Sequence, residues 1–261
     1  MPEGDTLHRS AARLRPALEG HRLARFEAPR LTGGVRPTIG STIERVEAVG
    51  KHLLITFDDG VVLRTHLRMS GSWHLYRLGD RWQKAPHLAR AVVGTDEWVA
   101  VCFSAPVVEA FRTPAPGASH PLDHLGPDLC LSDVDLDAAV ARFATVVEPD
   151  EQVKVALLDQ RIASGIGNVY ASEVCFACRV DPFTAIAALD VATRRRLLAT
   201  AAAQLQANLG TSRRTTVAGP PGSLAVYGRR GQPCRRCGTP VRMRLQGEQA
   251  RSTYWCPTCQ T

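Results

Sequence analysis

Four cysteines near the end of the chain have the spacing of a metal site. They form two C-x2-C pairs, Cys234 with Cys237 and Cys256 with Cys259, separated by 18 residues. Each pair places two sulfurs on one side of a tight turn, a spacing typical of a four-thiolate zinc ribbon. Disulfides are the alternative, and a reducing compartment disfavours them. We therefore expect one structural Zn²⁺ ion on these four cysteines.

The residues between the two pairs predict a β-hairpin. Its arms are residues 240–245 and 251–255, and the turn is Gln246-Gly-Glu-Gln249. A module of about 35 residues builds little hydrophobic core, so metal binding would supply much of its folding free energy.

The other cysteines show no such pattern. Cys175 and Cys178 form a third C-x2-C within a helical run, with no second pair nearby. Buried structural thiols are the favoured interpretation, and a redox or metal role is the weaker option. Cys102 and Cys130 are expected to be packing residues.

The basic charge is concentrated in the last fifth of the chain. The whole sequence carries 32 Lys and Arg against 25 Asp and Glu, a net charge of +7. Residues 211–261 hold nine arginines against one acid, Glu248, which is +8 and leaves −1 for residues 1–210. This local excess indicates a polyanion-binding region. An arginine-rich composition on a solvated surface is the alternative, but it does not explain why the excess is local.

Composition and hydrophobic patterning limit the class of protein. With 261 residues, 44% hydrophobic and 22% charged, the chain is globular and long enough for two modules. No window approaches the roughly 18 apolar residues of a membrane span. The first residues are acidic rather than basic and then apolar, unlike a signal peptide. We expect a soluble, cytoplasmic protein.

Periodicity predicts a β-rich first part and a helical second part. Asp5 or Thr6 would cap a first helix, residues 42–110 alternate as strands, and prolines from Pro106 to Pro121 mark a linker. Ser132 would cap the next helix. Three more helices are expected at residues 151–160, 168–178 and 190–209.

Four separated segments together resemble the formamidopyrimidine-DNA glycosylase and endonuclease VIII family of base-excision repair enzymes. They are Met1-Pro-Glu-Gly, Gly50-Lys51-His-Leu-Leu, Leu157 to Arg161 with Gly165 to Tyr170, and Val226 to Cys234 leading to Tyr254 to Gln260. They follow the family's order and span the whole chain. The resemblance implies an α+β fold with three parts. These are an N-terminal β-sandwich with an N-terminal helix (1–115), a helix–two-turn–helix domain (126–223) and a zinc-ribbon hairpin (224–261).

The resemblance also implies the catalytic residues. Pro2 would be the nucleophile once Met1 is removed, because an α-amino group with a pKa near 8 is partly neutral at pH 7 and can form a Schiff base. Glu3 would be the general acid/base, and Lys51 would transfer a proton in β-elimination. Arg251 would bind the phosphates at the lesion and assist δ-elimination. Without the family, Pro2 would be a proline that precedes a helix, Glu3 an ordinary surface acid and Lys51 a solvated lysine at a strand end.

DNA contacts follow from the same resemblance. Asn168 opens a helix after a glycine-punctuated turn and would bind a phosphate with Lys154 beside it, the alternative being an Asn helix cap. Arg68 and Met69 would fill the gap left by an everted base, although Met69 could instead be core. His124 aligns with a DNA-contacting position.

Departures from the family pattern favour the endonuclease VIII branch. Thr6 replaces a second acid, residues 103–109 hold valines in place of an arginine pair, and the loop at 211–223 is short. We expect a monomeric, nucleoid-associated enzyme that removes oxidised pyrimidines from damaged DNA and nicks the strand by β,δ-elimination. A non-catalytic DNA-binding protein and a ribbon that serves protein contacts remain the alternatives.

Overall fold

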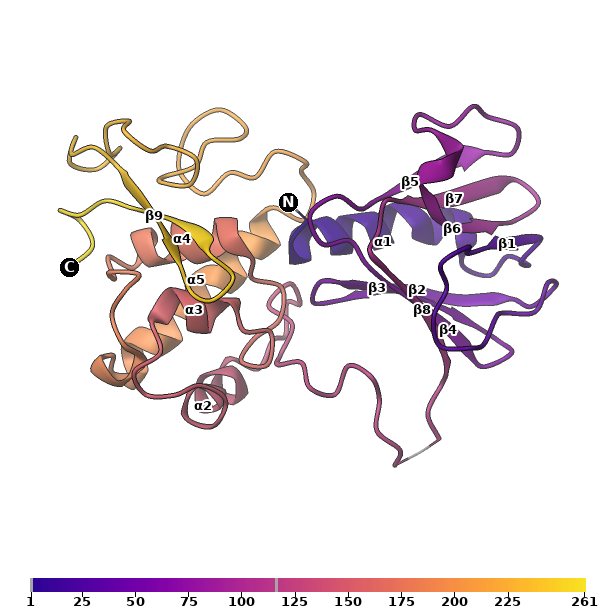
Figure 1. Ribbon diagram of the computed structural model, residues 1–261, viewed down its shortest axis with the longest axis horizontal. Helices are drawn as coiled ribbons and strands as arrows, with labels where there is room; N and C mark the ends of the chain where they lie inside the picture. Colours follow the sequence, from indigo (N-terminus) through magenta and orange to yellow (C-terminus); the bar gives the residue numbers. More distant parts are fainter. Residues whose placement is uncertain (1, 116) are drawn as a thin grey trace. The chain divides into compact units, whose positions relative to one another are not determined.

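The computed structural model describes residues 2–115 and 117–261, which form two compact units divided between Asp123 and His124 (Figure 1). Each unit has its own hydrophobic core. Within the described ranges, no helix is both long enough and apolar enough to cross a bilayer.

The first unit contains helix α1 (Gly4–Leu18) and two antiparallel four-stranded sheets, in the orders β2-β3-β4-β8 and β1-β6-β7-β5. A short 3₁₀ helix, η1 (Pro86–Leu88), precedes β6. The strands are β1 (Arg25–Glu27), β2 (Ile43–Val49), β3 (His52–Phe57), β4 (Val61–His66), β5 (Ser72–Arg77), β6 (Ala89–Gly94), β7 (Trp98–Phe103) and β8 (Val107–Arg112). The expected β-sandwich with an N-terminal helix is confirmed.

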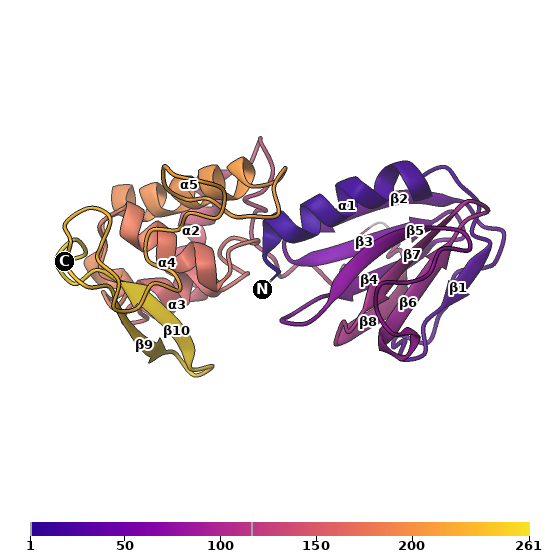
Figure 2. The same cartoon turned by 90° about the horizontal axis from the view of Figure 1, so that it is seen from above.

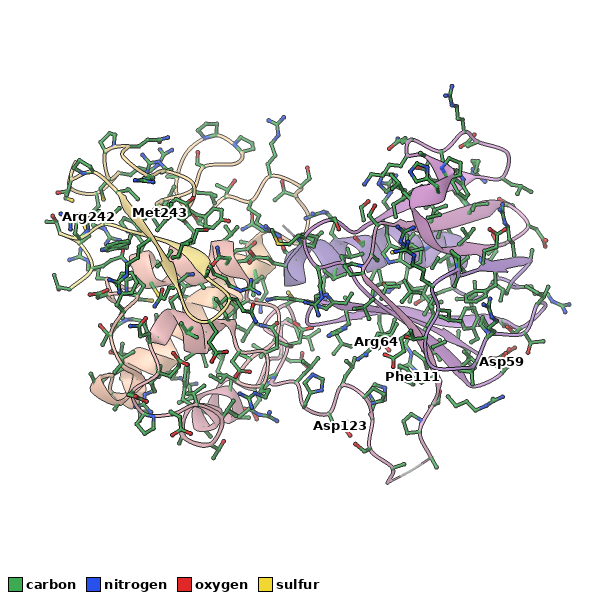
Figure 3. The ribbon with its side chains drawn as sticks, in the orientation of Figure 1. Asp59, Arg64, Phe111, Asp123, Arg242 and Met243 are labelled. Atoms are coloured by element: carbon green, nitrogen blue, oxygen red, sulfur yellow. The ribbon has the colours of Figure 1, made fainter. Side chains whose placement is uncertain are left out.

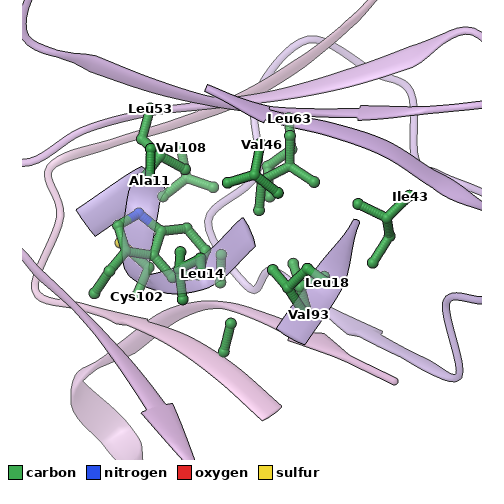
Figure 4. Packing of buried hydrophobic residues seen from close by; sticks show 14 of the residues in the cluster. Ala11, Leu14, Leu18, Ile43, Val46, Leu53, Leu63, Val93, Cys102 and Val108 are labelled. Atoms are coloured by element: carbon green, nitrogen blue, oxygen red, sulfur yellow. The ribbon is translucent and has the colours of Figure 1, made fainter. Parts of the chain in front are cut away.

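One buried face of α1 joins the two sheets into a single core (Figure 4). Its apolar residues recur every three or four positions, which places them on one side of the helix. They are Leu7, Ala11, Leu14 and Leu18, each at most 1% exposed. Inward residues of both sheets pack against this face, including Leu53 and Leu63 of one sheet and Val93 and Cys102 of the other.

Three element boundaries differ from the sequence prediction. Pro106 does not begin the linker, because it stands just before β8, where a proline costs no ladder hydrogen bond. Helix α1 begins after Glu3 rather than Asp5 or Thr6. Helix α2 is capped by Asp135 and not by Ser132, since the Asp135 carboxylate accepts a hydrogen bond from the backbone N–H of Ala138 at 2.9 Å.

The second unit is helical and ends in a two-stranded hairpin (Figure 2). The three later helices lie within three residues of their predicted limits. Strand β10 packs against α4. The elements are α2 (Leu136–Val146), α3 (Val153–Leu158), α4 (Asn168–Ala177), η2 (Ile186–Ala188), α5 (Val191–Ala207), β9 (Arg242–Gln246) and β10 (Arg251–Trp255). The division of this unit at residue 223 stays a prediction.

A buried carboxylate on α4 holds the segment that leads into the hairpin. Glu173 is 1% exposed and accepts hydrogen bonds from the backbone N–H groups of Ala225, Val226 and Tyr227 at 2.7–2.8 Å. The Thr216 hydroxyl donates to the same carboxylate. Because a buried charge is tolerated only when it is hydrogen-bonded, this arrangement fixes residues 225–227 against the helix.

Candidate active site and metal centre

The four C-terminal cysteines converge on one point. Their Sγ atoms all lie within 4.8 Å of one another, with 3.4 Å between Cys237 and Cys256 and 3.9 Å between Cys234 and Cys259. A disulfide needs about 2.05 Å, whereas tetrahedral ligation at about 2.3 Å separates sulfurs by roughly 3.8 Å. The cluster therefore fits a structural metal ion and not a pair of disulfides.

The turns at the cluster present the sulfurs as a metal knuckle requires. Gly238 has φ +78°, and its N–H donates to the carbonyl of Cys234 at 2.9 Å. Hydrogen bonds from Thr239 lower the pKa of Cys237 to about 6, whereas burial and the neighbouring thiols raise that of Cys259. A bound metal ion would require all four cysteines as thiolates. Gln260 holds the second turn against the residue that follows Arg179. Its Oε1 atom accepts the backbone N–H of Cys256 at 2.8 Å, and its Nε2 group donates to the carbonyl of Val180 at 3.0 Å.

The remaining four cysteines, Cys102, Cys130, Cys175 and Cys178, are buried. Burial raises the pKa of Cys175 to about 12 and also raises that of Cys102. The thiol of Cys178 contacts the hydroxyl of Thr200 at 3.3 Å. A high pKa suppresses thiolate chemistry at Cys102 and Cys175, and the structural role expected for all four cysteines stays a prediction.

Lys154 and Asn168 meet the hairpin at the start of α4. Lys154 is 1% exposed, and its Nζ donates to Asn168 Oδ1 at 2.7 Å and to the Ser252 carbonyl at 3.3 Å. The Asn168 Nδ2 group donates to the same carbonyl at 2.9 Å and to the Ser252 hydroxyl at 3.2 Å. Gly167 is the residue that caps α4, so the alternative that Asn168 serves as a helix cap is wrong.

Arg251 is the residue before Ser252 and opens β10 opposite Gln246. Its side chain is partly exposed, and its Nε and Nη2 groups both donate to Gln249 Oε1, the Nε bond being 2.9 Å long. The N-terminus of the ten-residue α4 and a buried ammonium thus lie beside an arginine-bearing hairpin. Such an arrangement favours the binding of an anion at this place. The sequence places Gln249 in the hairpin turn but does not predict it as a site residue.

The chain start is fixed to α1. The carbonyl of Glu3 accepts hydrogen bonds from the N–H groups of Thr6 at 2.9 Å and Leu7 at 3.3 Å. Pro2 is partly buried, and Glu3 is 0% exposed, so the alternative of an ordinary surface acid is wrong. Removal of Met1, on which the nucleophile prediction depends, lies outside the described residues.

Lys51 stands at the tip of a tight hairpin. With Gly50, whose φ is +57°, it forms the two-residue turn between β2 and β3. His66 at the end of β4 is the cross-strand partner of His52, and their rings lie 4.8 Å apart. Burial, Arg68 and Lys51 together lower the pKa of His66 to about 4. The structure therefore brings the cations of Lys51 and Arg68 close to one neutral imidazole.

The loop after β4 presents two side chains to solvent. Met69 is 70% exposed, so its assignment as a core residue is wrong. Arg68 is exposed and has the strained φ of +44°. Gly71 is required at the end of the loop, because a Cβ there would lie 2.7 Å from the Leu67 backbone. The Ser70 hydroxyl donates to the carbonyl of Ser104, between β7 and β8, at 3.1 Å.

Several arginines of the basic C-terminal region bind the protein itself. Arg235 and Arg236 donate to the carbonyls of Leu224 and Phe176, and the guanidinium of Arg244 lies 3.4 Å from the Phe183 ring centroid. Arg242 of β9, labelled in Figure 3, is exposed. His124 is exposed at the start of the second unit, and its DNA contact stays a prediction.

Comparison with known proteins identifies the family. Residues 1–106 match the formamidopyrimidine-DNA glycosylase N-terminal domain, residues 125–218 its H2TH domain, and residues 231–261 the zinc finger found in FPG and IleRS. The chain is 41% identical to the probable endonuclease 8 2 of Streptomyces coelicolor, over all of its own length and 94% of that protein. The chain belongs to the formamidopyrimidine-DNA glycosylase family. This family of DNA glycosylases and abasic-site lyases also includes the DNA-(apurinic or apyrimidinic site) lyase Nei2 of Mycolicibacterium smegmatis, 36% identical over the whole chain and 99% of that protein.

A solved structure of a formamidopyrimidine-DNA glycosylase confirms the fold. The structure of MutM in complex with carbocyclic 8-oxo-G-containing DNA superimposes on the chain with a TM-score of 0.84. All of both chains is covered at 21% sequence identity. The α+β fold class, with N-terminal sheets, a helical part and a cysteine-rich hairpin, is therefore confirmed.

Proposed function

We propose that the protein is a bifunctional DNA glycosylase and abasic-site lyase of base-excision repair, acting on oxidised pyrimidines and abasic sites in damaged DNA. The observation that carries the proposal is the cluster of Lys154, Asn168 and Ser252 at the start of α4, next to Arg251. A buried ammonium and a helix N-terminus form an anion site that suits a DNA phosphate. Membership of the family supplies the reaction class.

The first unit supplies the reacting amine. The Pro2 nitrogen, freed by loss of Met1, attacks C1′ of the damaged nucleotide, and the bond from C1′ to the base breaks as the base takes a proton. Glu3, held at the start of α1, is the general acid/base that opens the sugar ring. Lys51 moves a proton during elimination of the 3′ phosphate, and Arg68 and Met69 occupy the gap in the base stack.

The second unit supplies the residues that bind the DNA phosphates. Asn168 binds the backbone beside the lesion, and the buried cation of Lys154 behind it attracts the same phosphate. His124 adds a contact, and Arg251 binds the phosphate that leaves in δ-elimination. One Zn²⁺ ion on the four clustered cysteines would stabilise the fold of the hairpin that carries Arg251. The protein would act as a monomer on nucleoid DNA in the cytoplasm.

Hydride trapping on abasic-site DNA tests the nucleophile. Reduction should give a covalent adduct that peptide mapping places on Pro2, because an α-amino group is neutral in roughly a tenth of molecules at pH 7 and an unperturbed lysine in far fewer. Retaining a residue before Pro2 should abolish trapping. The matched variant Lys51→Ala should still trap but eliminate slowly.

Two results would overturn the proposal. An adduct on Lys51, or full trapping with a blocked N-terminus, would exclude Pro2 as the nucleophile. Tight binding of lesion DNA without turnover on any member of a panel of oxidised bases, in single and double strands, would favour the non-catalytic binder.

A further inference from the structure

Gln249 sits where it can control the orientation of Arg251. The chain bends at Ala250, whose φ is +47°, and the four-residue turn is closed by the Ala250 N–H donating to the Gly247 carbonyl at 2.9 Å. In this turn the Gln249 Oε1 atom accepts hydrogen bonds from both Nε and Nη2 of Arg251. One edge of the planar guanidinium is therefore occupied by a neutral acceptor from the protein.

A guanidinium has a second fork that this contact leaves open. The edge formed by its two terminal nitrogens can still donate two parallel hydrogen bonds to a phosphate. Because Gln249 carries no charge, it fixes the plane of the guanidinium without neutralising it. A carboxylate at the same place would compete with the phosphate.

The surroundings of Arg251 show why a neutral partner matters. Gln249 and Arg251 both line a cavity of about 570 Å³ between the hairpin turn and α3. Three acids line the same cavity, Glu151, Asp159 and Glu248. Asp159 is already paired with Arg161 at 2.6 Å, so without the Gln249 contact the arginine could turn towards Glu151 or Glu248 and form an ion pair.

We propose that Gln249 is a positioning residue for Arg251, which holds the guanidinium away from the cavity's carboxylates with its terminal fork presented to a DNA phosphate. This inference rests on the proposed function of Arg251. Gln249 touches no reacting atom and acts only through the arginine.

The test compares Gln249→Ala, Arg251→Ala and the double variant on DNA with an abasic site. Gln249→Ala should lower the ratio of δ- to β-elimination product about tenfold, the range for losing a hydrogen bond to a charged group. The rate of hydride trapping at Pro2 should not change. Arg251→Ala should lower the ratio at least as far, and the double variant should match Arg251→Ala, because the glutamine acts only through the arginine.

A matched control exists in the same region. Gln232 Oε1 accepts a hydrogen bond from Arg229 Nε at 3.1 Å, so Gln232→Ala removes a similar contact away from the residues that bind the DNA phosphates. It should leave the product ratio unchanged. Metal content and melting temperature of each variant should equal those of the unmodified protein, because Gln249 and Gln232 are exposed.

Binding to DNA that contains an uncleavable abasic analogue gives a second readout. Gln249→Ala should weaken binding severalfold and leave the slope of log K against log salt unchanged, since no charge is lost. Arg251→Ala should make this negative slope shallower by about 0.9. An unchanged product ratio and affinity in Gln249→Ala, or losses that add to those of Arg251→Ala, would overturn the inference. Failure of the proposed function would instead appear as absent trapping and absent cleavage by the unmodified protein.

Discussion

His66 is kept neutral by the residues around it. Burial and the nearby cations Arg68, Lys51 and Arg64 lower its pKa to about 4, and its Nδ1 atom accepts the backbone N–H of Arg68 at 3.2 Å. Protonation would therefore break a hydrogen bond and place a new positive charge among the cations at the Lys51 turn. The imidazole helps to hold the loop that carries Met69 only while it is uncharged.

Stability should consequently fall as the pH drops through this window. Above the unfolded pKa of about 6.5 the folded and unfolded states are both neutral at His66, and between 6.5 and 4 only the unfolded chain takes up the proton. We expect about 1–2 kcal/mol of unfolding free energy to be lost, after allowance for partial solvent screening. Denaturant titrations from pH 7 to pH 4 check this. His66→Gln should flatten the decline, and an equal decline in both proteins would contradict the assignment.

For single residues, the sequence predicted which side chains belong to the site better than it predicted their hydrogen-bond partners and burial. Lys154 and Asn168 were expected as neighbours because the resemblance named both, and their 2.7 Å contact agrees. Gln249 was missed, since a glutamine two residues before an arginine has no recognisable pattern. The burial of Glu3 was also missed, because a charged residue at a chain start is normally solvated.

Among the elements, α4 is the buried helix that holds the segment leading into the hairpin. All but one of its residues are buried, and its Glu173 carboxylate accepts the N–H groups of residues 225–227. The lead into the hairpin is thereby attached to the helix that begins with Asn168. Periodicity alone predicted the limits of this helix within one residue.

Glu173→Gln should destabilise the second unit by about 2–4 kcal/mol. The amide keeps the size of the side chain but presents an N–H₂ group where one oxygen accepted backbone hydrogen bonds, so buried donors lose their partner. Thermal or denaturant unfolding measures the change. The exposed Glu148→Gln serves as the control and should shift the unfolding free energy by less than about 0.5 kcal/mol. Equal effects of the two variants would show that the Glu173 network adds no stability.

Sequence patterns failed at the elements whose limits depend on tertiary contacts. The short strand β1 was not predicted, because three residues carry no measurable alternation. The linker prediction began at Pro106 because proline usually ends a strand, yet β8 starts at the next residue and pairs with β4 along its whole length. The helices, in contrast, follow from apolar spacing that needs no partner to be recognised.

The charge distribution acts over the whole molecule. Of nine arginines in residues 211–261, several have guanidinium groups engaged by carbonyls or rings of the protein, although they keep their charge. Fewer than nine phosphate contacts are therefore expected. The net charge of +7 still attracts a polyanion.

DNA affinity should fall steeply with salt. About five phosphate contacts give a slope of about −4.5 in log K against log salt, which is roughly 500-fold between 50 and 200 mM. Fluorescence anisotropy across this range measures the slope. Arg242→Ala should reduce it by about 0.9, because this exposed arginine is free to reach a phosphate. A flat plot would rule out electrostatic binding by the C-terminal region.

Removal of the metal should abolish strand cleavage. The hairpin has little core of its own, so loss of the thiolate cluster should release Arg251 and Ser252 from their places near α4. Metal content per chain and cleavage of abasic-site DNA are measured for Cys237→Ser. Cys178→Ala, which alters the buried cysteine that follows the last residue of α4, should keep its metal. Normal cleavage by metal-free protein would refute this role for the cluster.

Because Lys154 is buried, its chemical labelling can report when the second unit opens. Only three lysines are present, Lys51, Lys84 and Lys154, and the last is 1% exposed. An amine-reactive reagent can acylate Lys154 only when the second unit opens. Mass spectrometry of labelled peptides would therefore time the opening of that unit directly, with no added dye or isotope, and the more accessible Lys51 would supply the internal reference for reagent reactivity.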